Sequence, residues 1–168
     1  MKKHWIVVLS ALGFLLLASC TGKNLKTYNN VDEMVADAKK TVTFINAEEL
    51  KKTMDSGKKF YLIDCRETAE FDSSCIKGAV NVPRGVIENE ISNNAPKKKL
   101  TLLVYCNNGN KSILAATVLP KLKYTNVKVI EGGFDAIKTK FPDIIEMHPV
   151  RGGAKVKVPA KSSGGCGG

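Results

Sequence analysis

Histidine is scarce in this sequence, and no two of its cysteines form a CxxC pair. The 168 residues contain two histidines, His4 and His148, and five cysteines. Protein metal sites usually draw on closely spaced cysteine and histidine ligands. We therefore predict no bound metal and no cofactor. His148, which precedes Pro149, is expected to be a surface residue rather than a catalytic base.

Arginine is also scarce, although the chain is basic. The formal net charge is +10, but arginine occurs only at Arg66, Arg84 and Arg151. The lysines are scattered in short groups without interleaved aromatic residues. This pattern is typical of a solvated surface that attracts anions or anionic membranes, and it does not indicate a nucleic-acid site. We predict that nucleic acid is not a partner.

A long apolar run occurs only near the start of the chain. Residues 5–18 are apolar except for a serine and a glycine, and two lysines precede them. The run is too short for a comfortable membrane span and is typical of an export signal. Leu17-Ala18-Ser19-Cys20 resembles the bacterial lipobox, so residues 1–19 are predicted to be a lipoprotein signal peptide and Cys20 the lipidated first residue of the mature protein. The alternative is an ordinary signal peptide with an incidental cysteine.

The remaining chain divides into a tether at 20–30, a domain at 31–148 and a tail at 149–168. The tether is polar, and the tail is rich in glycine, lysine and serine, which is typical of a flexible segment. We expect an exported protein held by its lipid anchor at the envelope of a bacterial cell, on the periplasmic face or in the outer membrane. The sequence does not decide between the inner and the outer membrane.

Between residues 31 and 148, short apolar runs alternate with helical periods. Helices are predicted at 31–38, from Asn46 to about 57, at 84–93, at 112–123 with a kink at Pro120, and from Gly133 to before Pro142. Strands are predicted at 41–44, 60–64, 79–83, 100–105 and 127–130. The alternation favours an α/β fold with a central parallel sheet and helices on both faces.

The stretch YCNNGNKS, residues 105–112, forms a corner between a strand and a helix. Asn108-Gly109 would also suit a hairpin turn, but the residues after Lys111 do not alternate as a second strand would. Backbone N–H groups at such a corner, together with the helix dipole, favour an anion at the centre of the loop. We expect the thiolate of Cys106 to be that anion, with Lys111 adding positive charge at the rim and Gly109 permitting the turn.

Three motifs resemble the single-domain rhodanese family. Residues 64–83 resemble its Asp-x-Arg segment followed by Gly-His-Ile-x-Gly-Ala-x-Asn-x-Pro, residues 106–112 its active-site loop Cys-x-x-Gly-x-Arg-Ser, and residues 131–136 its closing Gly-Gly motif. The resemblance implies a rhodanese-like fold with a central parallel sheet. It also implies a sulfurtransferase in which Cys106 carries a persulfide.

The resemblance also suggests roles for individual residues. It assigns anion or substrate binding to the loop that follows the nucleophile, and it assigns a bracing role near the loop to Asp64 and Arg66. The loop residues are Asn107, Asn108, Gly109, Asn110, Lys111 and Ser112.

The chain departs from the family pattern at two positions. Lys111 replaces the usual arginine, so the charge is kept but the planar two-pronged anion grip is lost. Cys75 replaces the usual histidine, and Ser74 before it replaces glycine. Ser112 lies six positions after Cys106, where cysteine-dependent phosphatases need arginine, so the loop favours sulfur over phosphate chemistry.

The sequence allows alternative roles for the other cysteines. Cys65 is expected to be a small core residue, although a Cys65–Cys75 disulfide is a hypothesis, as is a Cys75 that resolves oxidised Cys106. Cys166 is either an idle cysteine in the tail or a swinging thiol that reaches Cys106.

The predicted function is transfer of sulfane sulfur through a Cys106 persulfide. The donor would be a small anion such as thiosulfate, or a persulfide, and the acceptor cyanide or a thiol on a small molecule or protein. One alternative is a non-catalytic module that binds an anion or a partner protein. Another is a thiol-redox protein that handles sulfur or selenium oxyanions.

Overall fold

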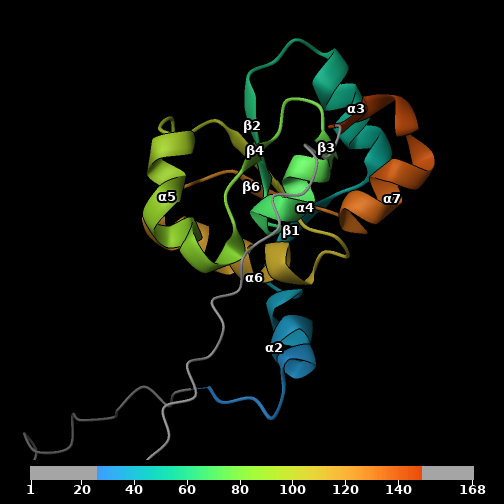
Figure 1. Ribbon diagram of the computed structural model, residues 1–168. Helices are drawn as coiled ribbons and strands as arrows, with labels where there is room; N and C mark the ends of the chain where they lie inside the picture. Colours follow the sequence, from blue (N-terminus) through green and yellow to red (C-terminus); the bar gives the residue numbers. More distant parts are fainter. Residues whose placement is uncertain (1–25, 149–168) are drawn as a thin grey trace, which may run out of the picture. The chain divides into compact units, whose positions relative to one another are not determined.

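The computed structural model describes residues 26–148 (Figure 1). The predicted signal peptide, most of the tether and the tail, with Cys20 and Cys166, lie outside the described residues. The helices are α2 Val31–Ala38, α3 Ala47–Asp55, α4 Thr68–Ser73, α5 Ile87–Asn94, α6 Asn110–Val118 and α7 Gly133–Lys140, with 3-10 turns η1 Arg84–Val86, η2 Leu119–Leu122 and η3 Pro142–Ile144. The strands are β1 Thr43–Ile45, β2 Phe60–Asp64, β3 Ser74–Ile76, β4 Val80–Asn81, β5 Thr101–Tyr105, β6 Val127–Ile130 and β7 Ile145–Met147.

Residues up to Met34 form one unit and residues from Val35 onward another. In the described part of the first unit, the Asn30 side chain accepts a hydrogen bond from the Glu33 amide at 2.9 Å, which caps the start of α2. Within residues 26–148 no helix is both long and apolar enough to cross a membrane. The second unit contains the sheet and the candidate site.

Five strands form a parallel sheet in the order β1-β6-β5-β2-β4. The middle strands β5 and β2 pair over five residues, from Phe60 opposite Thr101 to Asp64 opposite Tyr105. Because the strands run in one direction, their carboxyl ends meet at one edge of the sheet, where α/β proteins commonly bind ligands. The predicted central parallel sheet is confirmed.

Helices cover both faces of this sheet, as predicted. On one face Ile87 and Ile91 of α5 and Ala115 of α6 pack against the apolar side chains of β2 and β5. On the other face Leu50 of α3 and Ile137 of α7 pack against residues that alternate with the first set along the same strands. In Figure 1, α5 lies on one side of the strands, and α3 and α7 lie on the other.

Two features were not predicted. Helix α4 occupies residues 68–73, and a separate two-stranded antiparallel ribbon pairs β3 with β7. The ribbon brings the chain near residue 146 back to the segment around residue 75, and its register places Cys75 opposite Glu146. Cys75 therefore lies on a strand outside the main sheet.

Several boundaries also differ from the predictions. Helix α6 begins at Asn110, two residues earlier than predicted, because Gly109 adopts φ 99° and caps the helix. After Val118 the helix tightens into the 3-10 turn that contains Pro120, so the predicted kink ends the α-helix. The helix predicted at 84–93 is a 3-10 turn followed by α5, and β1 begins at Thr43 rather than at residue 41.

Candidate active site

Cys106 directly follows β5, at the carboxyl edge of the sheet between β5 and α6. Its sulfur accepts a hydrogen bond from the Gly109 amide, with 3.2 Å between Sγ and N. The Ser112 hydroxyl lies 3.8 Å from the same sulfur, but its proton has a nearer acceptor in the Gly109 carbonyl at 2.9 Å. The loop therefore directs a backbone donor at the sulfur, as the sequence predicts for this corner.

The reactive loop is closely packed around Cys106. The residue is only 1% exposed, and it forms part of the apolar cluster between the sheet and α5 and α6. The carboxamide oxygen of the exposed Asn108 lies 4.0 Å from the sulfur. Because Cys106 is almost fully buried, a reactant can reach the sulfur only if neighbouring atoms move.

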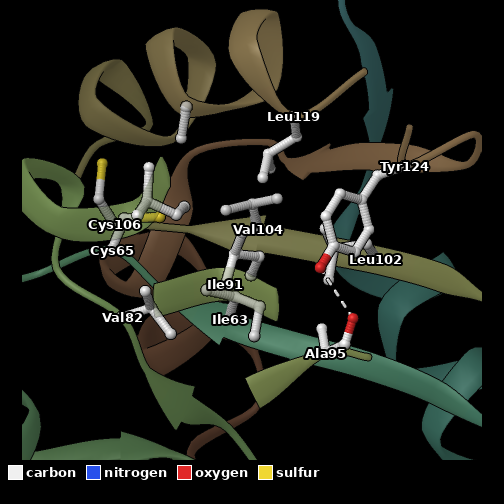
Figure 2. Packing of buried hydrophobic residues seen from close by; sticks show 12 residues of the cluster. Ile63, Cys65, Val82, Ile91, Ala95, Leu102, Val104, Cys106, Leu119 and Tyr124 are labelled. Carbon is white, nitrogen blue, oxygen red and sulfur yellow. Dashed lines mark hydrogen bonds between the residues drawn. The ribbon is translucent and has the colours of Figure 1, made fainter. Parts of the chain in front are cut away.

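Among the cysteines within residues 26–148, Cys65 is the one that neighbours the candidate nucleophile. It follows β2 as Cys106 follows β5, and its amide donates to the Tyr105 carbonyl at 2.7 Å. Figure 2 shows the two cysteines next to each other at one end of the cluster. Burial, and secondarily the nearby Cys106, raises the pKa of the Cys65 thiol. Cys65 is therefore a protonated core residue at neutral pH, as the sequence predicts.

Backbone amides at the start of α7 form hydrogen bonds with carbonyl groups of the loop. The Phe134 amide donates to the Cys106 carbonyl at 2.8 Å, and the Asp135 amide donates to the Asn107 carbonyl at 3.2 Å. This approach depends on Gly133, which has φ 62°. A Cβ atom there would lie 2.3 Å from the Cys106 oxygen and 2.4 Å from the Asn107 oxygen. The Gly-Gly motif thus brings the backbone of α7 against the loop.

Two carboxylates contact the loop, one from Glu70 of α4 and one from Glu67, the residue that precedes this helix. Asn107 donates from its side chain to Glu70 at 2.5 Å, and Lys111 forms an exposed ion pair with Glu67 at 2.8 Å. The hydrogen bond from Asn107 lowers the pKa of Glu70. The predicted positive charge of Lys111 is at the rim of the loop, but Glu67 largely neutralises it there.

Asp64 and Arg66 form a buried ion pair at the carboxyl end of β2. Their side chains are almost fully buried, and the Arg66 guanidinium donates to the Asp64 carboxylate at 2.6 and 2.9 Å. The guanidinium also donates to the Ser74 carbonyl at 2.7 Å and lies 3.9 Å from the centre of the Phe134 ring. These contacts join the end of β2 to the ribbon and to α7, which is the bracing geometry expected from the sequence.

The candidate auxiliary thiols are separated from the loop or lie outside the described residues. Cys65, Cys75 and Cys106 are free, so the Cys65–Cys75 disulfide is not formed. Cys75 lies on the ribbon within 3.7 Å of the His148 ring, whereas Cys65 is the neighbour of Cys106. The hypotheses that Cys75 resolves Cys106 and that Cys166 reaches it stay predictions.

Sequence reasoning missed the carboxylates of Glu67 and Glu70 as contacts of the loop. The spacing of Glu67 and Glu70 does match a capping box, and the Glu67 amide donates to the Glu70 carboxylate at 3.0 Å. Glutamate is not among the usual N-cap residues, so this pair was only a weak signal for a helix. Nothing in the sequence alone indicated that these side chains bind Asn107 and Lys111.

The fold and the loop together define an α/β domain with a cysteine-containing loop at the carboxyl edge of a parallel sheet. The rhodanese-like domain family matches residues 46–140, and the chain belongs to this family. It is 31% identical over 102 residues to the probable adenylyltransferase/sulfurtransferase MoeZ of Mycobacterium tuberculosis, which covers 60% of this chain and 26% of that protein. It is 33% identical over 66 residues to the thiosulfate sulfurtransferase PspE of Escherichia coli, which covers 39% of this chain and 64% of that one.

Solved structures of the same fold extend the comparison. The thiosulfate sulfurtransferase of Pseudomonas aeruginosa matches with a TM-score of 0.62 and 19% sequence identity, over 71% of this chain and 23% of that one. This likeness concerns the fold. The chain spans about a quarter of MoeZ and just under two thirds of PspE. The names of the relatives support a role of the sulfurtransferase type.

Proposed function

We propose that the protein transfers sulfane sulfur through a persulfide on Cys106. The observation that carries the proposal is the 3.2 Å hydrogen bond from the Gly109 amide to the Cys106 sulfur, in a loop that opens a helix. A backbone donor aimed at sulfur stabilises negative charge on it, and the thiolate is the nucleophilic form of cysteine. Thiosulfate, a small anion, and a persulfide are both compatible donors for this chemistry.

In the first half of the reaction, the Cys106 thiolate attacks the outer sulfur of thiosulfate. A bond forms between Sγ and that sulfur, the sulfur–sulfur bond of thiosulfate breaks, and sulfite leaves with the electron pair. The terminal sulfur of the resulting persulfide carries the negative charge. The atoms around Cys106 have to move to admit the donor, since the residue is only 1% exposed.

In the second half, an acceptor nucleophile attacks the terminal sulfur of the persulfide. Cyanide leaves as thiocyanate, or a thiolate leaves as a new persulfide, and the Cys106 thiolate is restored with the electron pair of the broken bond. No external oxidant or reductant is needed. The chain's contribution is to keep the sulfur in place while its charge moves by one atom.

Incubation with thiosulfate followed by intact-mass measurement tests the proposal. The wild-type protein should gain the mass of one sulfur atom, and cyanide should remove it with one equivalent of thiocyanate formed. Cys106→Ser should gain nothing. Cys75→Ser is the matched control, since it removes a thiol on the separate ribbon, and it should behave as the wild type.

The same measurement distinguishes the alternatives. If no sulfane donor modifies the wild-type protein, a binding module without turnover is favoured. If Cys106 instead forms a disulfide that depends on added thiol, thiol-redox chemistry is favoured. Either result would overturn the sulfurtransferase proposal.

We also propose that the chain is anchored at the bacterial cell envelope by a lipid on Cys20. Support comes from the lipobox-like residues 17–20 and the apolar run before them. In a bacterial host, metabolic labelling with an alkyne fatty acid should mark the wild-type protein and the control Cys166→Ala. Cys20→Ala should lose both the label and the membrane fractionation. A labelled Cys20→Ala variant would refute the anchor.

A further inference from the structure

The ribbon of β3 and β7 gathers three potential metal ligands away from the reactive loop. Cys75 on β3 lies opposite Glu146 on β7, and the ladder continues where the His148 amide donates to the Ser73 carbonyl at 3.0 Å. Alternate residues of a strand point to the same side, so His148 follows Glu146 on the face that carries Cys75. One donor atom from each residue lies within 4.8 Å of the other two.

The distance between the sulfur and the imidazole suits a shared metal ion. Sγ of Cys75 and Nε2 of His148 are 3.7 Å apart. Tetrahedral zinc has bonds of about 2.3 Å to sulfur and about 2.0–2.1 Å to nitrogen, which places the two ligand atoms about 3.6 Å apart. Glu146 is exposed, so rotation about its side-chain bonds can bring its carboxylate to an ion held by Cys75 and His148.

The backbone that carries the thiol is held on both sides. The Ser74 carbonyl accepts from the buried Arg66 guanidinium at 2.7 Å, and the Ile76 amide donates to the Tyr105 hydroxyl at 3.2 Å. Cys75 itself is only 3% exposed. A ligand fixed in this way loses little freedom when a metal binds.

The chemistry of the donors narrows the choice of ion. One thiolate, one imidazole and one carboxylate carry two negative charges, which balance a divalent cation. A sulfur ligand disfavours magnesium and calcium, whereas zinc accepts sulfur, nitrogen and oxygen together. Burial, and next the Glu146 carboxylate, raises the pKa of the free Cys75 thiol, so the ion would have to displace its proton.

We propose that Cys75, Glu146 and His148 form a zinc site with three protein ligands and a fourth position open to water or an external ligand. The site joins β7 to β3 and is independent of the proposed function of Cys106. Zinc bound only to the folded state should stabilise the domain. The cysteine that replaces the family's usual histidine thus has a use that does not involve Cys106.

Cobalt and zinc titrations of the reduced full-length protein test the site. Cobalt bound to a cysteine thiolate gives a near-ultraviolet charge-transfer band, which zinc should bleach by displacement at a stoichiometry of one. Cys75→Ser should abolish the band. His148→Gln and Glu146→Gln should weaken cobalt and zinc binding at least about tenfold, since each removes one ligand.

Matched variants identify the thiol that binds the metal and show whether a lost band results from misfolding. Cys106→Ser and Cys166→Ser each remove one of the other thiols and should keep both the band and the zinc stoichiometry. Glu146→Gln changes only an exposed side chain, so its fold should be intact by circular dichroism. The proposal is overturned if the wild-type protein binds no zinc, if Cys75→Ser keeps the band, or if Cys106→Ser loses it.

Discussion

Replacing Gly133 with alanine should damage both the stability of the domain and the reactivity of Cys106. The new Cβ would lie 2.3 Å from the Cys106 carbonyl oxygen and 2.4 Å from that of Asn107. Because these oxygens belong to the backbone, either α7 or the loop has to shift. The shift would break the hydrogen bonds that the Phe134 and Asp135 amides donate to the loop.

Gly57 provides a matched control for this substitution. It has φ 68°, close to the 62° of Gly133, but no atom lies within 4 Å of a Cβ built on it. Gly57→Ala therefore carries only the cost of a left-handed alanine, about 1–2 kcal/mol. Gly133→Ala carries the same cost and also loses two hydrogen bonds at about 0.5–1.5 kcal/mol each. We expect it to be about 1–3 kcal/mol less stable than Gly57→Ala.

Two assays measure the loss of stability and the loss of Cys106 reactivity separately. Urea unfolding gives the stability difference, and the loss of unfolded-chain entropy cancels because both variants exchange glycine for alanine. The rate of persulfide formation with thiosulfate should fall about 100-fold in Gly133→Ala, as expected for a displaced reacting atom, and stay unchanged in Gly57→Ala. Equal stabilities and equal rates for the two variants would refute the idea that α7 sets the position of the loop.

The remaining predictions concern the charged side chains around the loop. Asp64→Asn leaves its buried guanidinium partner uncompensated, so the free energy of unfolding measured in urea should fall by about 3–5 kcal/mol; a loss below about 1 kcal/mol would contradict this reasoning. Glu67→Gln frees the Lys111 ammonium to attract thiosulfate, so persulfide formation should be faster at low ionic strength, and the gain should disappear in about 1 M salt. A gain that salt does not change would point to another cause. The hydrogen bond from Asn107 lowers the pKa of Glu70 below its ordinary 4.5, so its stabilising contribution is present above that value and is lost as pH falls through the folded-state pKa. Glu70→Gln should therefore flatten the fall in melting temperature below pH 4.5, and a slope equal to that of the wild type would argue against this contact.

The main sheet and most of its helices could be predicted because their signals are local. The capping box at Asn46 and Glu49 has both of its hydrogen bonds, and α3 begins where it indicates. The compact apolar runs at 60–64 and 127–130 are strands over those same residues. Their alternation with helices was enough to predict the parallel arrangement.

Helix α4 and the ribbon escaped prediction because their stability comes from the rest of the fold. Helix α4 has six residues and buries none of them, so it has no apolar period. Each strand of the ribbon has three residues, too few for an alternation to be recognised. Pairing between such distant short strands becomes visible only when the chain is folded.

The position of Cys106 and the geometry of its loop could be predicted, but the residues around the loop could not. Residues 106–112 carry a local pattern, and the contact from the Gly109 amide to the Cys106 sulfur agrees with it. Lys111 was expected to place its charge at the rim of the loop, but its ion pair with Glu67, at the start of an unpredicted helix, was not foreseen. Cys75 was recognised as unusual, but its neighbours Glu146 and His148 are brought to it only by the ribbon.

The way α4 and α7 hold the loop has a consequence for protein engineering. A designer who grafted only residues 106–112 onto another scaffold would transfer a sequence without the contacts that shape it. Glu70, which precedes the loop in the chain, and Gly133, which follows it and has no side chain to block the contact, would have to be transferred as well. The smallest portable unit of this chemistry is therefore an assembly of three separate segments.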